Sequence, residues 1–343
     1  MKSRRKSQPA KIADVARIAG VSVATVSRAL ATPGIVSEET RAKVVAAVQR
    51  VGYTPNVAAQ NLRARRSRMA LVVVPNIENP FFSGILHGID EALSAAGYGF
   101  IVANLGDATE KESRYVDLAT AGLVDGVLLL CGHVPQGAQR SLDETRLPIV
   151  AACEFISGAR FPQVEVDNRA AAREAVEYLV GLGHRRIGYV SGPPRNVLDR
   201  ARRAGYRDAI GEAAPIEWDG DFTFAAGAAA ARAFLAMPER LRPSAIFAAN
   251  DEMAIGFLKS VHAAGLAVPD DVSVVGFDGI EYAEYCEPSL TTVVQPRRDI
   301  GIGAGRLLVD LMEGVPPTPT VVRIPTQLVV RGSTAPRAAR RSA

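Results

Sequence analysis

The spacing of apolar residues changes near Met69, and this change divides the chain into two regions. Before Met69, apolar residues recur three and four positions apart, which is the period of amphipathic helices. After Met69, they form short continuous runs separated by helical stretches, which is typical of buried parallel strands joined by helices. The pattern therefore predicts a small helical region followed by a larger α/β region.

The first region is expected to contain three helices, at 12–19, 23–30 and about 38–51. Gly20 breaks the first helix, and Ser22 is a suitable N-cap for the second. The residues expected to face inward are Ile12, Val15, Ala16 and Ala19, then Val26, Ala29 and Leu30, then Val44, Val45 and Val48. The first two helices and their glycine turn form a helix-turn-helix, whose second helix can enter the DNA major groove. The outward residues of that helix are the candidate base and phosphate contacts, namely Val23, Ala24, Thr25, Ser27 and Arg28.

Charge favours DNA binding over the alternative, an ordinary helical hairpin with a solvated polar face. Residues 1–68 contain 14 Lys and Arg against 3 Asp and Glu, a net charge of +11, and the remaining 26 and 33 give residues 69–343 a net charge of −7. The first region therefore has the electrostatic footprint of a domain that binds a polyanion. Residues 1–10 are expected to be a basic arm that touches phosphates without sequence preference.

Residues 53–68 connect the two regions and end in a cluster of arginines. Pro55 suits the first turn of a short helix, but a helix of about eight residues with little apolar surface is marginal in water. The stretch is therefore expected to be either a basic linker or a hinge helix that folds on DNA. In the second case the DNA contacts are Asn56, Ala59 and Leu62, with Leu62 as an apolar wedge that unstacks a base step in the minor groove.

The larger region contains seven apolar runs that are expected to be strands. They lie at 70–74, 99–103, 126–130, 148–152, 186–190, 245–248 and 272–276, with helical stretches between them such as 82–96, 169–182 and 251–264. This is too much for one compact domain, so the sequence predicts two doubly wound lobes. Ligands of such folds bind at the carboxyl ends of the strands, which a cleft between two lobes would gather together.

Other function classes fit the sequence less well. Gly301, Gly303 and Gly305 superficially resemble a dinucleotide fingerprint, but they follow polar residues and lack the full spacing. The four histidines are scattered, with no zinc-type spacing and no nucleophile elbow, so we expect neither an enzyme nor a cofactor or metal. Three cysteines, Cys131, Cys153 and Cys286, are expected to be buried free thiols. A small-molecule binding protein without DNA function accounts for the second region but not for the +11 of the first.

No apolar run approaches the ~20 residues that span a bilayer. The basic start of the chain is not followed by the apolar run that a secretory signal requires. We therefore expect a cytoplasmic protein without membrane partners.

Several separate motifs, in order, make the chain similar to the lactose-repressor (LacI) family of transcriptional regulators over residues 11–334. They are Ile12 to Ala16, Val21-Ser22, Thr25 to Arg28, Val36-Ser37, Gly52-Tyr53, Pro55-Asn56, Asn79 to Phe82, Asp125-Gly126, Gly183-His184, Asn250-Asp251 and Gly276 to Asp278. Stretches 161–168, 220–224, 290–297 and 331–334 resemble the cytidine-repressor branch. One departure is Lys11, which stands where family members often carry a capping Thr, so the first helix is expected to start less firmly.

The resemblance implies a homodimer on pseudo-palindromic operator DNA, with an α/β body of two periplasmic-binding-protein-like lobes. The implied segments are a basic arm (1–10), a helix-turn-helix domain (11–52), a hinge (53–68), an effector-binding and dimerisation domain (69–334) and a tail (335–343). Within the large domain, one lobe comprises 69–166 with 296–326 and the other 167–295 with 327–334. The chain is thus expected to return to the first lobe near Gln295.

The resemblance also places effector contacts at Phe81, Asp167, Arg200, Phe222, Asn250 and Asp278. Carboxylate and amide groups can bind vicinal hydroxyls, an arginine can form forked hydrogen bonds, and an aromatic ring can cover a sugar or base. The alternatives are simple strand-to-helix turns at Asp167 and Asp278 and a solvated helix charge at Arg200. The expected effector is a nucleoside. A sugar is the alternative, because Arg200 follows the sugar- and purine-repressor pattern more than that of the cytidine repressor.

Overall fold

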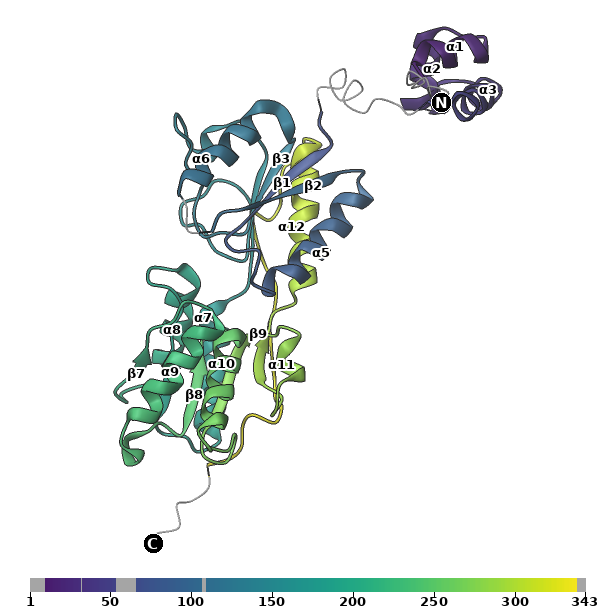
Figure 1. Ribbon diagram of the computed structural model, residues 1–343. Coiled ribbons are helices and arrows are strands. Elements are labelled where there is room, and N and C mark those ends of the chain that lie inside the picture. The colour runs from purple at the N-terminus through teal and green to yellow at the C-terminus, as the bar shows by residue number, and fades with distance from the viewer. Residues whose placement is uncertain (1–9, 32, 54–65, 107–108, 338–343) are drawn as a thin grey trace, which may run out of the picture. The chain divides into compact units, whose positions relative to one another are not determined.

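The computed structural model describes residues 10–31, 33–53, 66–106 and 109–337, and it divides into two compact units, Met1–Ser67 and Arg68–Ala343 (Figure 1). Each unit is described by itself. The predicted hinge contacts Asn56, Ala59 and Leu62 lie outside the described residues.

The first unit contains the three expected helices. They are α1 (Ile12–Ala19), α2 (Val23–Ala31) and α3 (Glu38–Val51), with a 3₁₀ turn at Pro33–Ile35. Their buried core consists of Val15, Ala16, Val26, Ala29, Val44 and Ala47. The prediction for Val45 was wrong, because its side chain is 41% exposed and the smaller Ala47 lies on the inner face of α3 instead.

Each helix of the first unit is capped only where its N-cap side chain can accept a hydrogen bond from a backbone N–H group. Ser22 Oγ accepts from Thr25 N at 3.1 Å, as predicted, and Ser37 caps α3 in the same way through Thr40 N. At the start of α1, Lys11 has no side-chain acceptor and forms no cap, so only Asp14 Oδ2 contributes, by accepting from Lys11 N at 3.0 Å. This helix therefore keeps one of the two hydrogen bonds of a capping box.

The first lobe of the second unit is built on a six-stranded parallel sheet with the strand order β11-β5-β4-β3-β1-β2. The strands are β1 (Met69–Val74), β2 (Gly99–Asn104), β3 (Gly126–Leu129), β4 (Ile149–Ala152), β5 (Gln163–Glu165) and β11 (Val321–Arg323). Alternate residues of β1 enter two different cores: Ala70, Val72 and Val74 in one, Leu71 and Val73 in the other. The first core includes α5 (Phe81–Ala95) and α12 (Arg297–Met312), and the second includes α6 (Thr109–Leu118).

The second lobe repeats this plan with the order β12-β10-β9-β8-β6-β7, in which β12 alone runs antiparallel to its neighbour. Its strands are β6 (Ile187–Val190), β7 (Ile216–Trp218), β8 (Ala245–Ala248), β9 (Ser273–Asp278), β10 (Thr291–Val294) and β12 (Gln327–Val329). Its helices are α7 (Asn168–Gly181), α8 (Val197–Ile210), α9 (Phe224–Ala236), α10 (Asp251–Ala263) and the short α11 (Tyr282–Tyr285). Helices flank both sheets, and α12 lies beside α5 on the first one (Figure 1).

All seven predicted strands are present, and their ends differ from the prediction by at most two residues. Five further strands, β5, β7, β10, β11 and β12, were not predicted from the apolar pattern. Each has only three or four residues, and β11 and β12 are partly exposed edge strands, so they carry little apolar periodicity. The two sheets confirm the predicted fold class of a helical head followed by two doubly wound lobes.

The three cysteines are free, as predicted, but only Cys131 and Cys153 are buried, and Cys286 is half-buried. Burial raises the pKa of the Cys131 thiol to about 12. A thiol that stays protonated at neutral pH is a poor nucleophile and a poor metal ligand.

The glycine-rich stretch 301–305 lies inside α12, where it lets this helix approach α5 closely. A Cβ on Gly301 would lie 2.1 Å from Ile85 O, and a Cβ on Gly88 of the facing helix would lie 2.1 Å from Arg298 O. Gly301 and Gly88 therefore allow the backbones of α12 and α5 to pack directly against each other. This close packing gives the glycines of α12 a structural role that does not involve a nucleotide.

Gly301→Ala is expected to lower the free energy of unfolding by about 1–3 kcal/mol, because the helices must separate to admit the methyl group. Gly303→Ala is the matched control in the same helix, since its Cβ would lie 3.7 Å from Val164 Cγ1, an ordinary contact. Alanine should raise stability there by about 0.5–1 kcal/mol through helix propensity. Urea denaturation of the full chain measures both, and equal effects of the two substitutions would contradict this packing.

Candidate effector site and DNA-binding surface

The outer face of α2 carries the five predicted DNA-contacting residues of this helix. Val23 is 43% exposed, Ala24 and Arg28 are exposed, and Thr25 and Ser27 are half-buried. Arg28 Nε donates to Ala24 O at 3.3 Å, and Thr25 Oγ1 lies 2.8 Å from Ser22 Oγ. These side chains lie on the side of α2 away from its buried residues, so the structure brings them together on one surface.

In both sheets of the second unit, strand order reverses beside the first strand of the lobe, at β1/β3 and at β6/β8. Doubly wound folds bind ligands beyond the carboxyl ends of the strands at such a switch point. β8 ends at Ala248, and Asn250 lies two residues after this end. Asp278 is the last residue of β9. The predicted effector residues of the second lobe therefore lie at the edge of the sheet where this fold binds ligands.

Arg202 of α8 joins several of these strand ends, although the sequence analysis did not select it. It is 1% exposed, its Nε donates to Asn168 Oδ1 at 2.9 Å, and its Nη1 donates to Ala249 O. Its Nη2 lies 3.2 Å from Asp278 Oδ1, and its guanidinium lies 3.8 Å from the centre of the Phe277 ring. The buried guanidinium of Arg202 thus links the start of α7, the segment after β8 and the end of β9.

Asp278 is 5% exposed and has a φ of 112°, a strained conformation for a residue with a side chain. Burial raises the pKa of its carboxyl, although Arg202, Gln295 and Arg297 each act to lower it. Gln295 Nε2 donates to Asp278 Oδ1 at 2.8 Å. The side chain is therefore oriented by neighbouring groups before any ligand arrives.

Phe222 and Asn250 are in direct contact. Asn250 is 1% exposed, its Nδ2 donates to Phe222 O at 3.0 Å, and its Oδ1 accepts from Met253 N at the start of α10. Phe222 has a φ of 69°, and its ring lies over Gly192, where a Cβ would be only 2.3 Å from Phe222 Cζ. The absence of a side chain at Gly192 thus lets the aromatic ring lie against the loop after β6.

Arg200 and Asp167 are the exposed members of the predicted set. Arg200 lines a cavity of about 610 Å³, together with Ser191, Gly192 and Asn196 from the loop after β6. Asp167 caps α7, with its Oδ1 accepting from Ala170 N at 3.0 Å. Asp167 therefore has the structural role of a helix cap, and its neighbour Asn168 is the residue that contacts Arg202.

Phe81 lies in the first lobe, 5% exposed at the start of α5. Arg297 links the start of α5 to the second lobe. Its Nη1 donates to Pro80 O at 3.4 Å, and its Nη2 donates to Gly279 O at 3.0 Å. A second contact between the lobes joins Asn196 Nδ2 to Glu154 Oε1 at 3.3 Å. The two lobes thus meet beside the predicted effector residues.

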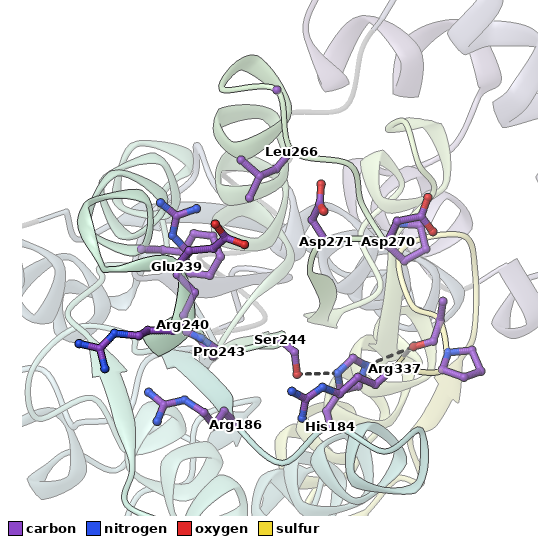
Figure 2. Close-up of a pocket in the computed structure, with 16 residues that line it drawn as sticks. His184, Arg186, Glu239, Arg240, Pro243, Ser244, Leu266, Asp270, Asp271 and Arg337 are labelled. Atoms are coloured by element: carbon purple, nitrogen blue, oxygen red, sulfur yellow. Dashed lines mark hydrogen bonds between the residues drawn. The ribbon is translucent and has the colours of Figure 1, made fainter. Parts of the chain in front are cut away.

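A separate cavity of about 780 Å³ lies at the opposite edge of the second sheet (Figure 2). Arg186, Ser244 and Asp271 line it, and they precede β6, β8 and β9, so the cavity lies at the amino ends of the strands. His184 in its wall contacts Ser244 Oγ at 2.9 Å through Nδ1 and Ala335 O at 3.2 Å through Nε2, as Figure 2 shows. His184 thus ties the segment near Ala335 to the sheet.

The sequence analysis missed Arg202, Gln295 and Arg297. Arg202 lies in the run Arg200 to Arg203, which has the appearance of a solvated helix face. A helical projection could have found it, because Arg202, Gly205 and Tyr206 share the buried face of α8. The apolar pattern gives no such indication for Gln295 and Arg297, whose role depends on where α12 starts.

The part of the chain that the structure describes contains neither a membrane-spanning helix nor a metal-binding cluster. No helix there is long and apolar enough to span a membrane. No group of three or more His, Cys, Asp or Glu residues there is arranged to hold a metal ion.

Comparison with known proteins places both units in one family. Residues 11–56 match the family described as "Bacterial regulatory proteins, lacI family", and residues 176–334 match the "Periplasmic binding protein-like domain". The chain is 39% identical to the HTH-type transcriptional repressor CytR of Escherichia coli (strain K12), over 97% of this chain and 99% of the relative.

Solved structures give the same result. A transcriptional regulator CelR–cellobiose complex is 35% identical with a TM-score of 0.72, covering 94% of this chain and 99% of that one. A lac repressor dimer bound to operator and the anti-inducer ONPF is 29% identical with a TM-score of 0.86, covering 96% of this chain and 100% of that one.

Proposed function

Because the chain belongs to the LacI family of bacterial transcriptional regulators, we propose that it is a cytoplasmic homodimeric repressor whose operator affinity depends on a small molecule bound between two lobes. The observation that carries this proposal is that the chain has both an exposed, basic helix-turn-helix and a strained polar cluster at the carboxyl ends of the strands of the second sheet. The solved lac repressor, a dimer on operator, supports the dimer and the DNA partner.

In this proposal each head reads one half of a pseudo-palindromic operator. Arg28 and Thr25 contact bases or phosphates in the major groove, and Val23, Ala24 and Ser27 complete the surface. Asn56, Ala59 and Leu62 of the two hinges bind at the operator centre, where Leu62 pries a base step apart.

The proposed segments are those set out from the sequence, with the head at 11–52, the hinge at 53–68 and the two-lobed domain at 69–334. Strand order supports the proposed crossovers. β10 ends at Val294 in the second sheet, α12 packs in the first core, and β12 at Gln327–Val329 pairs again with β10.

The proposed effector is a nucleoside that lies among Phe81, Asp167, Arg200, Phe222, Asn250 and Asp278. The four stretches that resemble the cytidine-repressor branch support this class, and the chain is similar to CytR over 97% of its length. An aromatic ring beside an oriented carboxylate suits a base and the hydroxyls of its ribose. Exposed Arg200 and the similarity to the CelR–cellobiose complex keep a sugar as the second candidate.

Thermal denaturation of the full chain with nucleosides, nucleobases and common sugars tests the effector class. A ligand at 100 times its dissociation constant stabilises the folded state by about 2.7 kcal/mol, which corresponds to about 5–10 °C for a domain of this size. We expect a nucleoside to give this shift and Asp278→Ala and Arg200→Ala to abolish it.

Arg240→Ala is the control, because exposed Arg240 lines the other cavity, at the amino ends of the strands. The shift should survive this substitution. A sugar that raises the melting temperature while every nucleoside leaves it unchanged would overturn the nucleoside proposal. A shift that is lost only in Arg240→Ala would show that the ligand binds in the other cavity.

A further inference from the structure

Glu252, the second residue of α10, has a buried side chain whose electrostatic surroundings are unfavourable. It is 8% exposed, and its Oε1 has no hydrogen-bond donor among the described residues. It also forms none of the ion pairs in the described part of the chain. A buried acceptor without a donor costs free energy in the unliganded protein, and folded proteins rarely retain one.

The groups that face Glu252 are themselves acidic. Burial raises the pKa of Glu252 to about 7, and the negative charges of Asp278 on β9 and Asp221 in the loop between β7 and α9 add to this effect. The two cations that act on the neighbouring Asp278 are engaged with other groups, since Arg202 pairs with Asp278 and Arg297 donates to Gly279 O. Arg232 of the packed helix α9 is exposed.

The preceding residue, Asp251, shows the contrasting arrangement. Its Oδ2 accepts from Ile280 N at 2.8 Å, and its Oδ1 accepts from Thr292 Oγ1 at 2.5 Å. Asp251 therefore fastens α10 to the loop after β9 and to β10. Consecutive helix residues point about 100° apart, so the Glu252 side chain leaves α10 in a different direction from that of Asp251. Glu252 lies in the first turn of α10, two residues after Asn250, whose Nδ2 donates to Phe222 O, and this turn begins at the carboxyl end of β8 beside the predicted effector residues.

We infer that Glu252 is an effector-contacting residue that determines specificity, with its carboxylate accepting a hydrogen bond from an N–H or O–H group of an uncharged effector. This inference rests on the proposed function and adds a contact that the family motifs did not indicate. A donor from the ligand satisfies the unpaired oxygen, and the accumulation of three carboxyl groups at Asp221, Glu252 and Asp278 favours hydroxyl- or amino-rich ligands. Such donors occur both in a nucleoside and in a free sugar.

Binding should also depend on pH through Glu252. A donor from the ligand stabilises the ionised carboxylate, so the effector lowers the pKa of Glu252 and releases a proton on binding. Affinity for the wild-type protein is therefore expected to rise as the pH increases through about 7, the pKa of Glu252 in the free protein. Since Asp251 and Asp278 have raised pKa values too, the informative quantity is the difference between wild type and Glu252→Gln.

Calorimetric titration of the full chain with cytidine, adenosine and D-ribose between pH 6 and pH 8.5 tests the inference. We expect Glu252→Ala to weaken binding of the stabilising probe by about 10- to 100-fold at pH 8, because a charge-assisted hydrogen bond is lost. Glu252→Gln should recover part of the affinity, because its amide oxygen still accepts, and should flatten the pH dependence. The control is Glu212→Gln, an exposed glutamate, which should leave affinity and pH profile unchanged.

Folding is checked in the same variants without ligand. The folded-state pKa of Glu252 lies above its ordinary value of 4.5, so the wild type loses stability relative to Glu252→Gln as the pH rises from about 4.5 through about 7. A melting-temperature difference that grows over this window supports an unpaired carboxyl. A difference that stays constant with pH contradicts it.

The possible outcomes separate the two proposals. Nucleoside binding that is unaffected by Glu252→Ala overturns the role of Glu252 and leaves the nucleoside effector standing. Binding of D-ribose alone, lost in Glu252→Ala, supports Glu252 and overturns the nucleoside. A wild-type protein that binds none of the three probes overturns both in the form stated here.

Discussion

Replacing Arg28 with glutamate is expected to lower specific operator affinity by at least about 100-fold. Arg28 is exposed on the outer face of α2, where its Nε donates to Ala24 O of its own helix. A lost arginine contact to a base costs about 1–3 kcal/mol, and a dimer carries two copies of the substitution. The reversed charge adds repulsion from the phosphates. Fluorescence anisotropy on a duplex selected from a random library by the wild-type protein measures the effect.

The control is Arg50→Glu, which changes the net charge equally from the exposed last turn of α3. This variant is expected to lose non-specific affinity but to keep its preference for the selected duplex. The wild-type affinity should fall steeply with salt, because each phosphate contact releases about 0.9 counterion on duplex DNA. An Arg28→Glu protein that still protects the operator at moderate salt would contradict the assignment of α2 as the reading helix.

Arg202→Leu is expected to lower the free energy of unfolding by about 3–5 kcal/mol, the largest effect on stability that we predict, because it leaves a buried carboxylate without its cation. Arg202 is 1% exposed and Asp278 is 5% exposed, so water cannot readily replace the lost partner. Asn168 and Ala249 lose a buried donor at the same time. Urea denaturation of the full chain at several pH values measures the loss.

The pH dependence of this loss has a definite sign. Without Arg202, the pKa of Asp278 rises further above its unfolded value, so ionisation opposes folding and the defect grows as the pH increases. The double variant Arg202→Leu/Asp278→Asn should recover part of the stability, since it removes the buried carboxylate that lost its cation. A double variant that is less stable than Arg202→Leu alone would contradict this explanation.

The sequence predicted the elements of this fold well because the main strands are continuous apolar runs and the main helices are amphipathic. β8 has the predicted ends, 245–248, since Arg242-Pro243 before it and Asn250-Asp251 after it interrupt the apolar run. The errors have local causes. On α3, Val45 and Ala47 are both apolar, so hydrophobicity alone does not show which of them faces the core. The core of this small unit contains the smaller side chain, Ala47, and Val45 is exposed.

The polar site was only partly predictable. Asp278 and Asn250 belong to recognisable motifs, and they lie at the carboxyl ends of β9 and β8, where this fold binds ligands. Arg202 and Glu252 lie within helices among other charged residues, and charged helical residues are usually solvated. Their burial results from tertiary packing of α8 and α10 against the strand ends, which the sequence pattern does not contain.

In the proposed repressor, operator binding at α2 is coupled to a nucleoside bound beside Asp278. This coupling is tested most directly by titrating the selected duplex with the full-length wild-type protein, with and without a saturating nucleoside, at one fixed salt concentration. If the nucleoside binds the DNA-bound and the DNA-free protein with different affinities, it must change the operator dissociation constant by the same factor. This factor is typically about 5- to 150-fold. We predict a change in this range for the wild type and none for Asp278→Ala. An operator affinity that the bound nucleoside leaves unchanged in the wild type would contradict this coupling.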